Sequence, residues 1–280
     1  MNDIGDRFKQ NYEAPARHLL TRRTPVIVRV DGRAFHTFTR KFRKPFDGKF
    51  IDSMILAASS LAGEMQGFKM GYVQSDEASF VLTDYDNLQT QPWFGYVKSK
   101  VESISAAKMT FAFARCMRLI GINEEALFDA RAFNAPEAEV VNYFVWRARD
   151  WYRNSVTMYA SAHFSHKELL NKSARDMHEM LHLIGLNWAA DLMPEEMNGT
   201  FLVGLDLIAR PDVKPTYQAI NALWESVNPC NPTLISMKPQ NTTSEVVNTS
   251  NLELNPTAVG LIAGPAVGDG IELPSNEIKP

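Results

Sequence analysis

The sequence has few of the features that mark secreted, membrane-spanning or zinc-binding proteins. Its 280 residues include only two cysteines, Cys116 and Cys230, which are too few and too isolated for a disulfide framework or a zinc set. No apolar run is long enough to cross a membrane, and residues 1–7 are polar and lack the apolar core of an export signal. We therefore expect reduced, structural thiols and a cytoplasmic protein.

The sequence also lacks a strong net charge, a Walker loop and a dinucleotide-binding fingerprint. A net charge of −3 does not by itself favour RNA, because affinity for a phosphate backbone comes largely from Lys and Arg. The charge is uneven, since residues 211–280 hold seven acids and three lysines, a net of −4, which leaves +1 for residues 1–210. Basic residues cluster locally in that first part, and such local patches would meet a phosphate.

Two short segments each run from an apolar strand into an acidic residue at a turn. Residues 26–30 predict a strand that stops at Asp31-Gly32. Residues 71–82 predict a hairpin whose tip presents Asp76 and Glu77. If the two strands are neighbours, Asp31 and Asp76 lie close together. Carboxylate oxygens are preferred ligands of Mg²⁺, and a pair of such ions binds both the attacking and the leaving oxygen in phosphoryl transfer. The alternative interpretation is a set of solvated turn acids.

The remaining pattern predicts an α+β fold with a ferredoxin-like palm. Apolar residues at helical spacing predict helices over residues 47–67 and 92–113, and residues 128–133 predict a further strand. Pro136 opens a long helix whose buried stripe runs from Val140 to Val156. The order strand, helix, hairpin, helix, strand is typical of an antiparallel sheet with helices packed on one face.

Composition changes at about residue 228. From there on prolines punctuate a stretch rich in Asn, Thr, Ser and Gly. Such a segment cannot bury much apolar surface, so we expect residues 228–280 to form a low-complexity tail that is disordered or loosely attached. The alternative is a small β-appendage from Glu253 to Leu273.

Several motifs follow one another at defined spacing. They are Arg29-Val-Asp-Gly-Arg-Ala-Phe-His36, Lys44-Pro45, Gln74-Ser-Asp-Glu77 with Ser79-Phe80, Phe128-Asp-Ala-Arg131 and Trp146-Arg147. In order and spacing they resemble the tRNA(His) guanylyltransferase superfamily of 3′-to-5′ RNA polymerases. The resemblance covers roughly residues 1–205, with looser collinear matches after residue 170.

The resemblance implies a polymerase- or cyclase-like palm and an enzyme that adds GMP or other nucleotides to the 5′ end of tRNA. ATP would adenylylate the RNA 5′-monophosphate, and the 3′-hydroxyl of an incoming nucleotide, usually GTP, would then displace AMP with two Mg²⁺ ions bound. It implies a catalytic core over residues 1–135, a helical part that contacts tRNA over residues 136–227, and a homo-oligomer, usually a tetramer.

The resemblance also assigns site residues. Asp31 and Asp76 are the expected metal ligands, together with a backbone carbonyl of Gly32, and Glu77 is either a further catalytic acid or the residue that holds Asp76 in place. The expected nucleotide contacts are Asp31, Gly32, Arg33, Ala34, Phe35, His36, Lys44, Ser75 and Asp76. The expected tRNA contacts are Arg147, Arg149, Arg153 and Asn154. A glycine at position 32 would let a triphosphate approach the main chain closely.

One departure from the family pattern concerns the substrate. Members that act on histidine tRNA carry a His-Ile-Asn-Asn type motif, whereas this chain has Tyr152-Arg-Asn-Ser155. The missing histidine favours 5′-end repair of several tRNAs over strict specificity for histidine tRNA. Two alternative functions are a palm-type nucleotide cyclase and a non-catalytic ferredoxin-like RNA-binding module.

Overall fold

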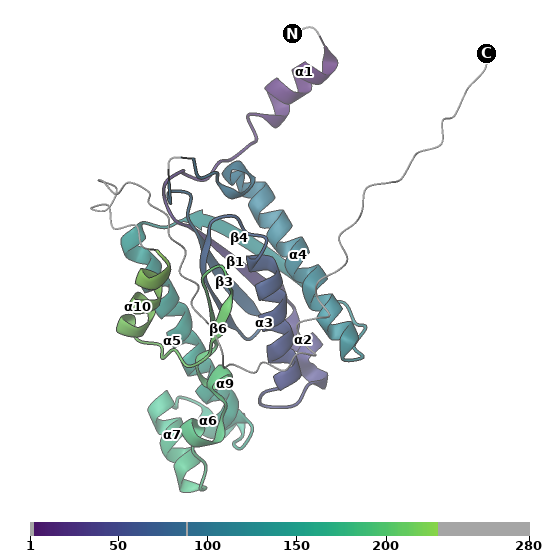
Figure 1. Cartoon of the computed structure of the whole chain (residues 1–280). Coiled ribbons are helices and arrows are strands. Elements are labelled where there is room, and N and C mark those ends of the chain that lie inside the picture. The colour runs from purple at the N-terminus through teal and green to yellow at the C-terminus, as the bar shows by residue number, and fades with distance from the viewer. Residues whose placement is uncertain (1–2, 88, 229–280) are drawn as a thin grey trace, which may run out of the picture. The chain divides into compact units, whose positions relative to one another are not determined.

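A six-stranded antiparallel sheet organises the chain in the computed structural model, which describes residues 3–87 and 89–228 (Figure 1). The strand order is β4-β1-β3-β2-β5-β6. The strands are β1 (Val26–Arg33), β2 (Phe68–Gln74), β3 (Glu77–Leu82), β4 (Leu127–Asn134), β5 (Thr200–Val203) and β6 (Ile208–Arg210). The first four have the order of a ferredoxin-like fold, so the predicted α+β palm is confirmed.

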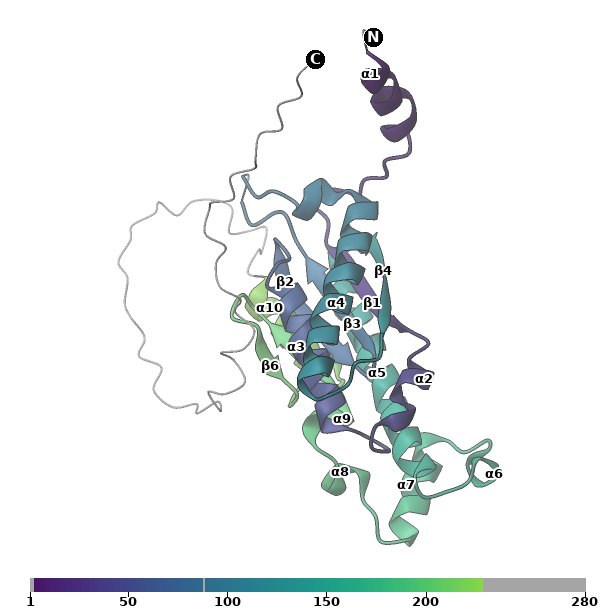
Figure 2. The ribbon, with the colours of Figure 1, turned by 90° about the vertical axis from the view of Figure 1, so that its right-hand side faces the viewer.

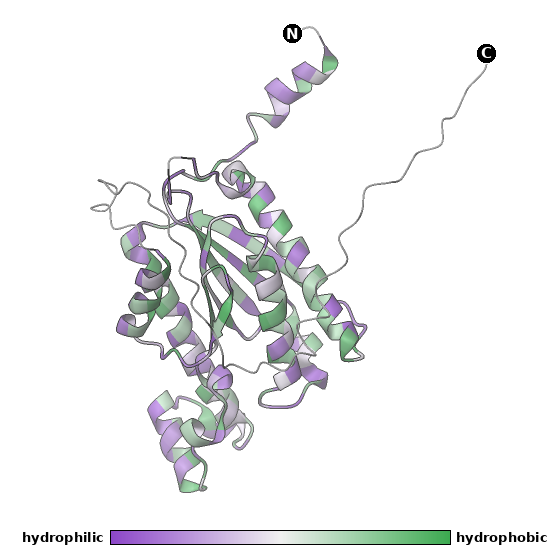
Figure 3. Ribbon diagram, viewed as in Figure 1, coloured by the Kyte–Doolittle hydropathy of each residue, from purple (hydrophilic) through white to green (hydrophobic). Residues whose placement is uncertain are grey.

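Helices cover both faces of this sheet, and the prediction of helices on one face was wrong (Figures 1 and 2). Helices α3 (Gly48–Ala62) and α4 (Lys98–Leu119) pack on the face that carries Val28. Helices α5 (Glu137–Ser161) and α10 (Tyr217–Val227) pack on the face that carries Ile27. Side chains alternate along a strand, so a strand that is apolar at both parities needs cover on both sides. Figure 3 shows that hydrophobic residues predominate in the strands.

Several element bounds differ from the predicted ones. Strand β1 runs on to Arg33 because its backbone pairs with β4 as far as Leu127, so Asp31 lies within the strand and not after it. Helix α3 ends at Ala62, before a turn in which Gly67 has φ of +81°. The helix predicted from residue 92 begins only at Lys98, because positive φ angles in η3 (Trp93–Tyr96) interrupt the helical backbone.

Short helices surround the C-terminal half of α5. They are α6 (His166–Leu169), α7 (Ala174–Leu183), α8 (Trp188–Asp191) and α9 (Pro194–Asn198). Their core includes Trp151, Val156 and Leu181, and capping boxes at Ser165 and Ser173 begin α6 and α7. The other short elements are α1 (Ile4–Phe8), the π-helical η1 (Lys9–Glu13), α2 (Phe35–Phe38) and η2 (Thr39–Lys41).

Helix α5, with which the predicted tRNA-contacting part begins, packs directly against the sheet of the predicted catalytic core. The predicted tail lies outside the described residues, apart from Asn228, whose side-chain amide donates to Glu137 at 2.8 Å. In the part of the chain that the structure describes, no helix combines the length and apolar character needed to cross a membrane.

Candidate active site

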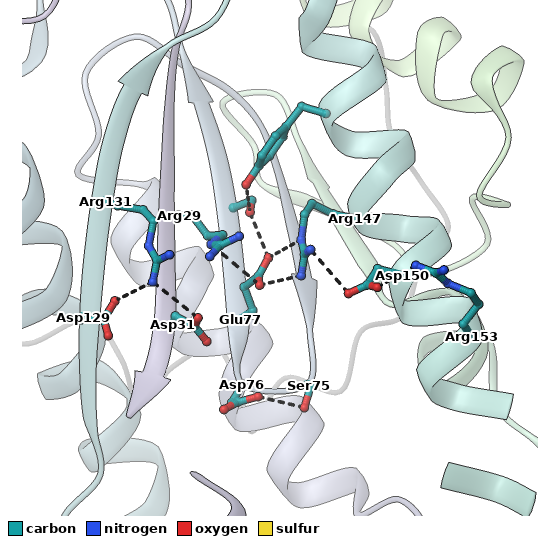
Figure 4. Close-up of polar contacts among 12 residues, drawn as sticks. Arg29, Asp31, Ser75, Asp76, Glu77, Asp129, Arg131, Arg147, Asp150 and Arg153 are labelled. Carbon is teal, nitrogen blue, oxygen red and sulfur yellow. Dashed lines mark hydrogen bonds and ion pairs between the residues drawn. The ribbon is translucent and has the colours of Figure 1, made fainter. Parts of the chain in front are cut away.

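The register of three strands sets acidic residues side by side on the α5 face of the sheet. Asp31 of β1 is the direct partner of Asp129 on β4 and of Glu77 on β3. Figure 4 shows these side chains with the arginines that lie among them. Three neighbouring carboxylates repel one another, so cations must stabilise them. The nearby guanidinium groups supply part of this positive charge, and an expected metal ion would supply the rest.

The hairpin between β2 and β3 places Asp76 beside this row. Gln74 pairs with Glu77, which leaves Ser75 and Asp76 as a two-residue turn, and Ser75 has φ of +46° in the left-handed region. The Gly32 N–H donates to the Asp76 carbonyl at 3.0 Å, which fixes the turn against β1. The structure therefore brings Asp31 and Asp76 together, although Asp31 lies inside a strand.

The electrostatics around Asp76 fit a bound cation. Burial raises the pKa of the Asp76 carboxyl, and the nearby Asp31 and Glu77 carboxylates raise it further, against a hydrogen bond from Ser75 at 3.0 Å that lowers it. The closest guanidinium nitrogen to Asp31 is that of Arg131 at 3.9 Å, which is too long for a hydrogen bond. Two carboxylates without a close counter-ion are suitable ligands for Mg²⁺.

No cluster of three or more His, Cys, Asp or Glu side chains suited to a metal occurs within residues 3–87 and 89–228. A Mg²⁺ ion at this place would be held by the carboxylates of Asp31 and Asp76 and a main-chain oxygen of Gly32. Mg²⁺ commonly binds in this way, with one or two carboxylates and with phosphates and water at the remaining positions.

The prediction that the hairpin tip presents Glu77 beside Asp76 was wrong, and so is the alternative of a solvated turn acid for Glu77. It is the first residue of β3, only 8% exposed, and its two carboxylate oxygens accept hydrogen bonds from Arg147 at 2.7 Å each. The Ser79 hydroxyl also donates to it at 3.4 Å. A carboxylate held in this way anchors α5 to the hairpin, which favours the positioning role over that of a further catalytic acid.

The expectation that Arg147 faces solvent for tRNA was also wrong. Arg147 is only 7% exposed. Besides its bonds to Glu77, its guanidinium lies 3.4 Å from the Asp150 carboxylate. It also lies over the ring of Trp146, 4.6 Å from the centroid. Arg147 is thus enclosed between α5 and the hairpin and is a structural residue.

The other predicted tRNA contacts do lie on the surface of α5. Arg149, Arg153 and Asn154 are exposed, and Arg153 forms an ion pair with Asp150 at 2.9 Å. Asn154 lines a hollow together with Asp31 and Asp76. An RNA that contacts the exposed side of α5 would therefore come close to the paired acids.

The predicted nucleotide contacts divide between exposed and buried positions. Arg33 and Ala34 are exposed and line a hollow with Arg40 and Lys41, and His36 is exposed beside Thr37, whose hydroxyl is 3.1 Å from Nε2. These side chains lie at the surface, in the segment that directly follows Asp31 in the sequence.

Phe35 is different, because its side chain is only 3% exposed and packs against the rings of Phe50, Phe113 and Phe128. The expectation that its side chain contacts a nucleotide is not supported. A Cβ at Gly32 would lie 2.4 Å from the Phe35 ring, so the fold itself requires glycine at that position.

Lys44 and Ser75 line a pocket that lies between the loop before α3, the β2–β3 hairpin and α5. Phe46 and Trp151 also line this pocket. Ser75 also lines the hollow that contains Asp31 and Asp76. The two cavities therefore adjoin at Ser75, which places an apolar recess next to the acids.

Sequence patterns assigned no role to Arg29, Asp129 or Arg131, although each lies in a motif quoted above. All three project from the same sheet face as Asp31, since they occupy alternate positions on β1 and β4. The period-2 alternation in those two strands is the signal that could have found them.

The chain is similar to known proteins of one family. The family model for tRNAHis guanylyltransferase matches residues 6–136. An uncharacterized protein of Acanthamoeba polyphaga mimivirus is 30% identical over 182 residues, 56% of this chain and 62% of that protein. A probable tRNA(His) guanylyltransferase of Dictyostelium discoideum is 31% identical over 156 residues, 53% of this chain and 58% of that protein. The chain thus spans less than two thirds of these relatives.

Solved structures match over more of the chain. A bacterial tRNA(His) guanylyltransferase-like protein in complex with ATP has a TM-score of 0.76 and 36% identity, and the match covers 80% of this chain and 99% of that one. The tRNA(His) guanylyltransferase from Saccharomyces cerevisiae matches with a TM-score of 0.63 and 20% identity, over 74% of this chain and 96% of that one. This match shows a shared fold.

Proposed function

This chain belongs to the tRNAHis guanylyltransferase family, and we propose that it is a nucleotidyltransferase that adds nucleotides to the 5′ end of tRNA in the 3′-to-5′ direction. The observation that carries the proposal is the convergence of Asp31 and Asp76, held together by the Gly32 N–H, on one face of a palm-like sheet. Paired carboxylates at such a place suit phosphoryl transfer.

We propose ATP and GTP as its nucleotide substrates. Solved structures of bacterial guanylyltransferase-like proteins that this chain matches at 36% and 33% identity are complexes with ATP and with GTP respectively. Lys44 and Ser75 lie at a cavity beside the acids, where a lysine side chain supplies a mobile positive charge to a triphosphate. The exposed Arg33 adds a second cation on the surface near the acids.

Each site residue would have a distinct part in the reaction. Asp31 and Asp76 would hold Mg²⁺, which when bound neutralises phosphate charge and acidifies the attacking 3′-hydroxyl. The ion pair of Glu77 with Arg147 keeps the hairpin in place against α5, so that the Asp76 carboxylate stays directed at the site. Positioning and charge neutralisation account for the chemistry, since phosphoryl transfer needs little covalent help from side chains.

We further propose repair of 5′-truncated tRNAs as the main task. Within Tyr152-Arg-Asn-Ser155, Tyr152 contacts Nε2 of His178 at 3.1 Å, and Ser155 is buried and accepts from the Trp188 indole at 3.0 Å. Only the middle two residues of the segment face outward. Exposed arginines on α5 would bind the acceptor backbone without reading sequence, so pairing with the opposite strand would supply selectivity. We also expect a cytoplasmic homo-oligomer.

The test is a nucleotide-addition assay with purified protein, Mg²⁺, ATP, labelled GTP and a panel of intact and 5′-truncated tRNAs. We expect extension of truncated tRNAs of several kinds at least as efficiently as addition of an unpaired guanylate to intact histidine tRNA. Strong preference for intact histidine tRNA in competition would overturn the repair assignment. Conversion of GTP to a cyclic nucleotide without any RNA would favour the cyclase, and RNA binding without nucleotide consumption would favour the binding module.

A further inference from the structure

Two arginines face each other across β1 and β4, and neither forms a short ion pair with the acids around it. Arg29 and Arg131 are direct partners in the antiparallel register, and both project from the sheet face that carries Asp31 (Figure 4). Like charges placed directly opposite on neighbouring strands destabilise a sheet. A bound anion between the two guanidinium groups would reduce this repulsion.

Arg29 is the more deeply placed of the two. Its side chain is 16% exposed, its nearest acid is Glu77 at 3.9 Å, and its Nε has no hydrogen-bond partner among the described residues. Glu77 does not satisfy it, because 3.9 Å is too long for a hydrogen bond, and the Glu77 carboxylate is held by two short hydrogen bonds from Arg147. A buried donor left without a partner costs free energy.

Arg131 has only long contacts as well. Its guanidinium lies 3.4 Å from Asp129 and 3.9 Å from Asp31, and half of its side chain is exposed. Arg131 therefore presents unused N–H donors toward solvent beside Asp31, and the Nε of Arg29 is a buried donor without a partner on the neighbouring strand. Guanidinium forks of this kind bind phosphate oxygens, often with two hydrogen bonds at once.

The surroundings of the arginine pair favour RNA over a free nucleotide. Phe133 follows Arg131 on the same face of β4, and its ring contacts Tyr143, which in turn contacts the half-exposed Trp146. Exposed aromatic rings stack on unpaired bases. In the strand order, the cavity of Lys44 and Ser75 lies on the other flank of Asp31, toward the hairpin.

We propose that Arg29 and Arg131 bind the terminal phosphate of the RNA 5′ end. The inference rests on the proposed function and adds the site for its RNA substrate. The paired acids would then lie between the phosphate of the RNA and the triphosphate of the nucleotide, as transfer between the two requires.

The test compares two forms of one 5′-truncated tRNA, with a 5′-monophosphate and with a 5′-hydroxyl, in a binding competition with EDTA and no nucleotide. The wild type should bind the phosphorylated form about tenfold more tightly or better, because two charged donors contact one phosphate. Arg29→Gln and Arg131→Gln should each reduce this ratio toward one, and Arg131→Lys should restore part of it. A wild-type ratio near one, or variants that keep the wild-type ratio, would overturn the proposal.

Controls separate this role from folding, from general RNA affinity and from nucleotide binding. Arg149→Gln should weaken binding of both RNA forms alike, since Arg149 is exposed on α5, whereas Arg29 and Arg131 lie on strands of the sheet. Arg131 is half exposed, so its variant keeps the test valid even if Arg29→Gln unfolds. Loss of GTP affinity in the variants with an intact 5′-phosphate preference would assign the arginines to the nucleotide and overturn the proposal.

The nucleotide-addition assay on the same RNAs shows which of the two proposals fails, the proposed function or the phosphate site. A 5′-phosphate preference that depends on both arginines, in a protein that adds no nucleotide, would overturn the proposed function and support the phosphate site. Nucleotide addition without such a preference would overturn the phosphate site alone.

Discussion

Replacement of Arg147 by methionine should destabilise the protein by about 3 kcal/mol, because it leaves the buried Glu77 carboxylate without its main partner. Removing one partner of a buried ion pair costs about 3–5 kcal/mol. We expect the lower end, since Arg29 remains 3.9 Å from Glu77 and supplies part of the lost positive charge. Methionine keeps the apolar stem of the side chain, so the loss reports on the guanidinium, that is, on its two hydrogen bonds to Glu77 at 2.7 Å and its contacts with Asp150 and Trp146.

Urea unfolding of the full chain measures this cost, and a double-mutant cycle isolates the pair. Glu77→Gln should also destabilise, and the double variant Glu77→Gln/Arg147→Met should lose about 1–3 kcal/mol less than the two single losses added together. Arg153→Met is the matched control on the same helix, since the exposed pair of Arg153 with Asp150 should contribute less than about 1 kcal/mol.

A loss below about 1 kcal/mol in Arg147→Met, together with additive effects in the cycle, would refute the reasoning. The ion pair would then not hold α5 against the hairpin, and the positioning role of Glu77 would have no basis.

Three further predictions concern the acids, the backbone and pH. Asp76→Asn should reduce nucleotide addition by about 10²-fold or more with the circular dichroism spectrum unchanged, and activity within about tenfold of wild type would exclude Asp76 as a metal ligand. Gly32→Ala should lower the free energy of unfolding by about 1–3 kcal/mol, because the new Cβ meets the Phe35 ring at 2.4 Å, whereas Gly48→Ala, with nothing within 4 Å, should not. Hydrogen bonds from a backbone N–H and a tyrosine hydroxyl lower the pKa of Asp191, so its stabilising contribution is present above the pKa of a free aspartate and is lost as pH falls. Asp191→Asn should therefore flatten the fall in urea midpoint between about pH 5 and pH 3, and equal slopes would contradict this.

The sequence sufficed for the parts of the fold that depend on local pattern. The strand around Val28 is a β-rich apolar run, and the order of the predicted elements specified a ferredoxin-like arrangement that the structure confirms. The meeting of Asp31 with the hairpin follows from that arrangement, because in it the first and third strands are neighbours.

Other features depend on contacts between distant residues and could not be predicted in this way. Arg147 lies 70 residues from Glu77 in sequence, and an arginine beside an apolar helical stripe is normally exposed. Periodicity identifies the apolar side of a helix such as α5 but not the sheet face on which it packs. The burial of Phe35 likewise depends on Phe113 and Phe128, far along the chain.

Strand β1 has consequences for how repeated addition could proceed. Asp31 lies in a strand that is hydrogen-bonded on both sides, to β3 and to β4, so its backbone cannot follow a growing RNA end. Under the proposed function each cycle lengthens the RNA by one nucleotide at the end that reacts, while the acids stay in place. The RNA itself must then translocate by one step, or dissociate and rebind, between additions. The stationary strand thus makes substrate repositioning, rather than movement of the catalytic acids, the step that would limit processivity.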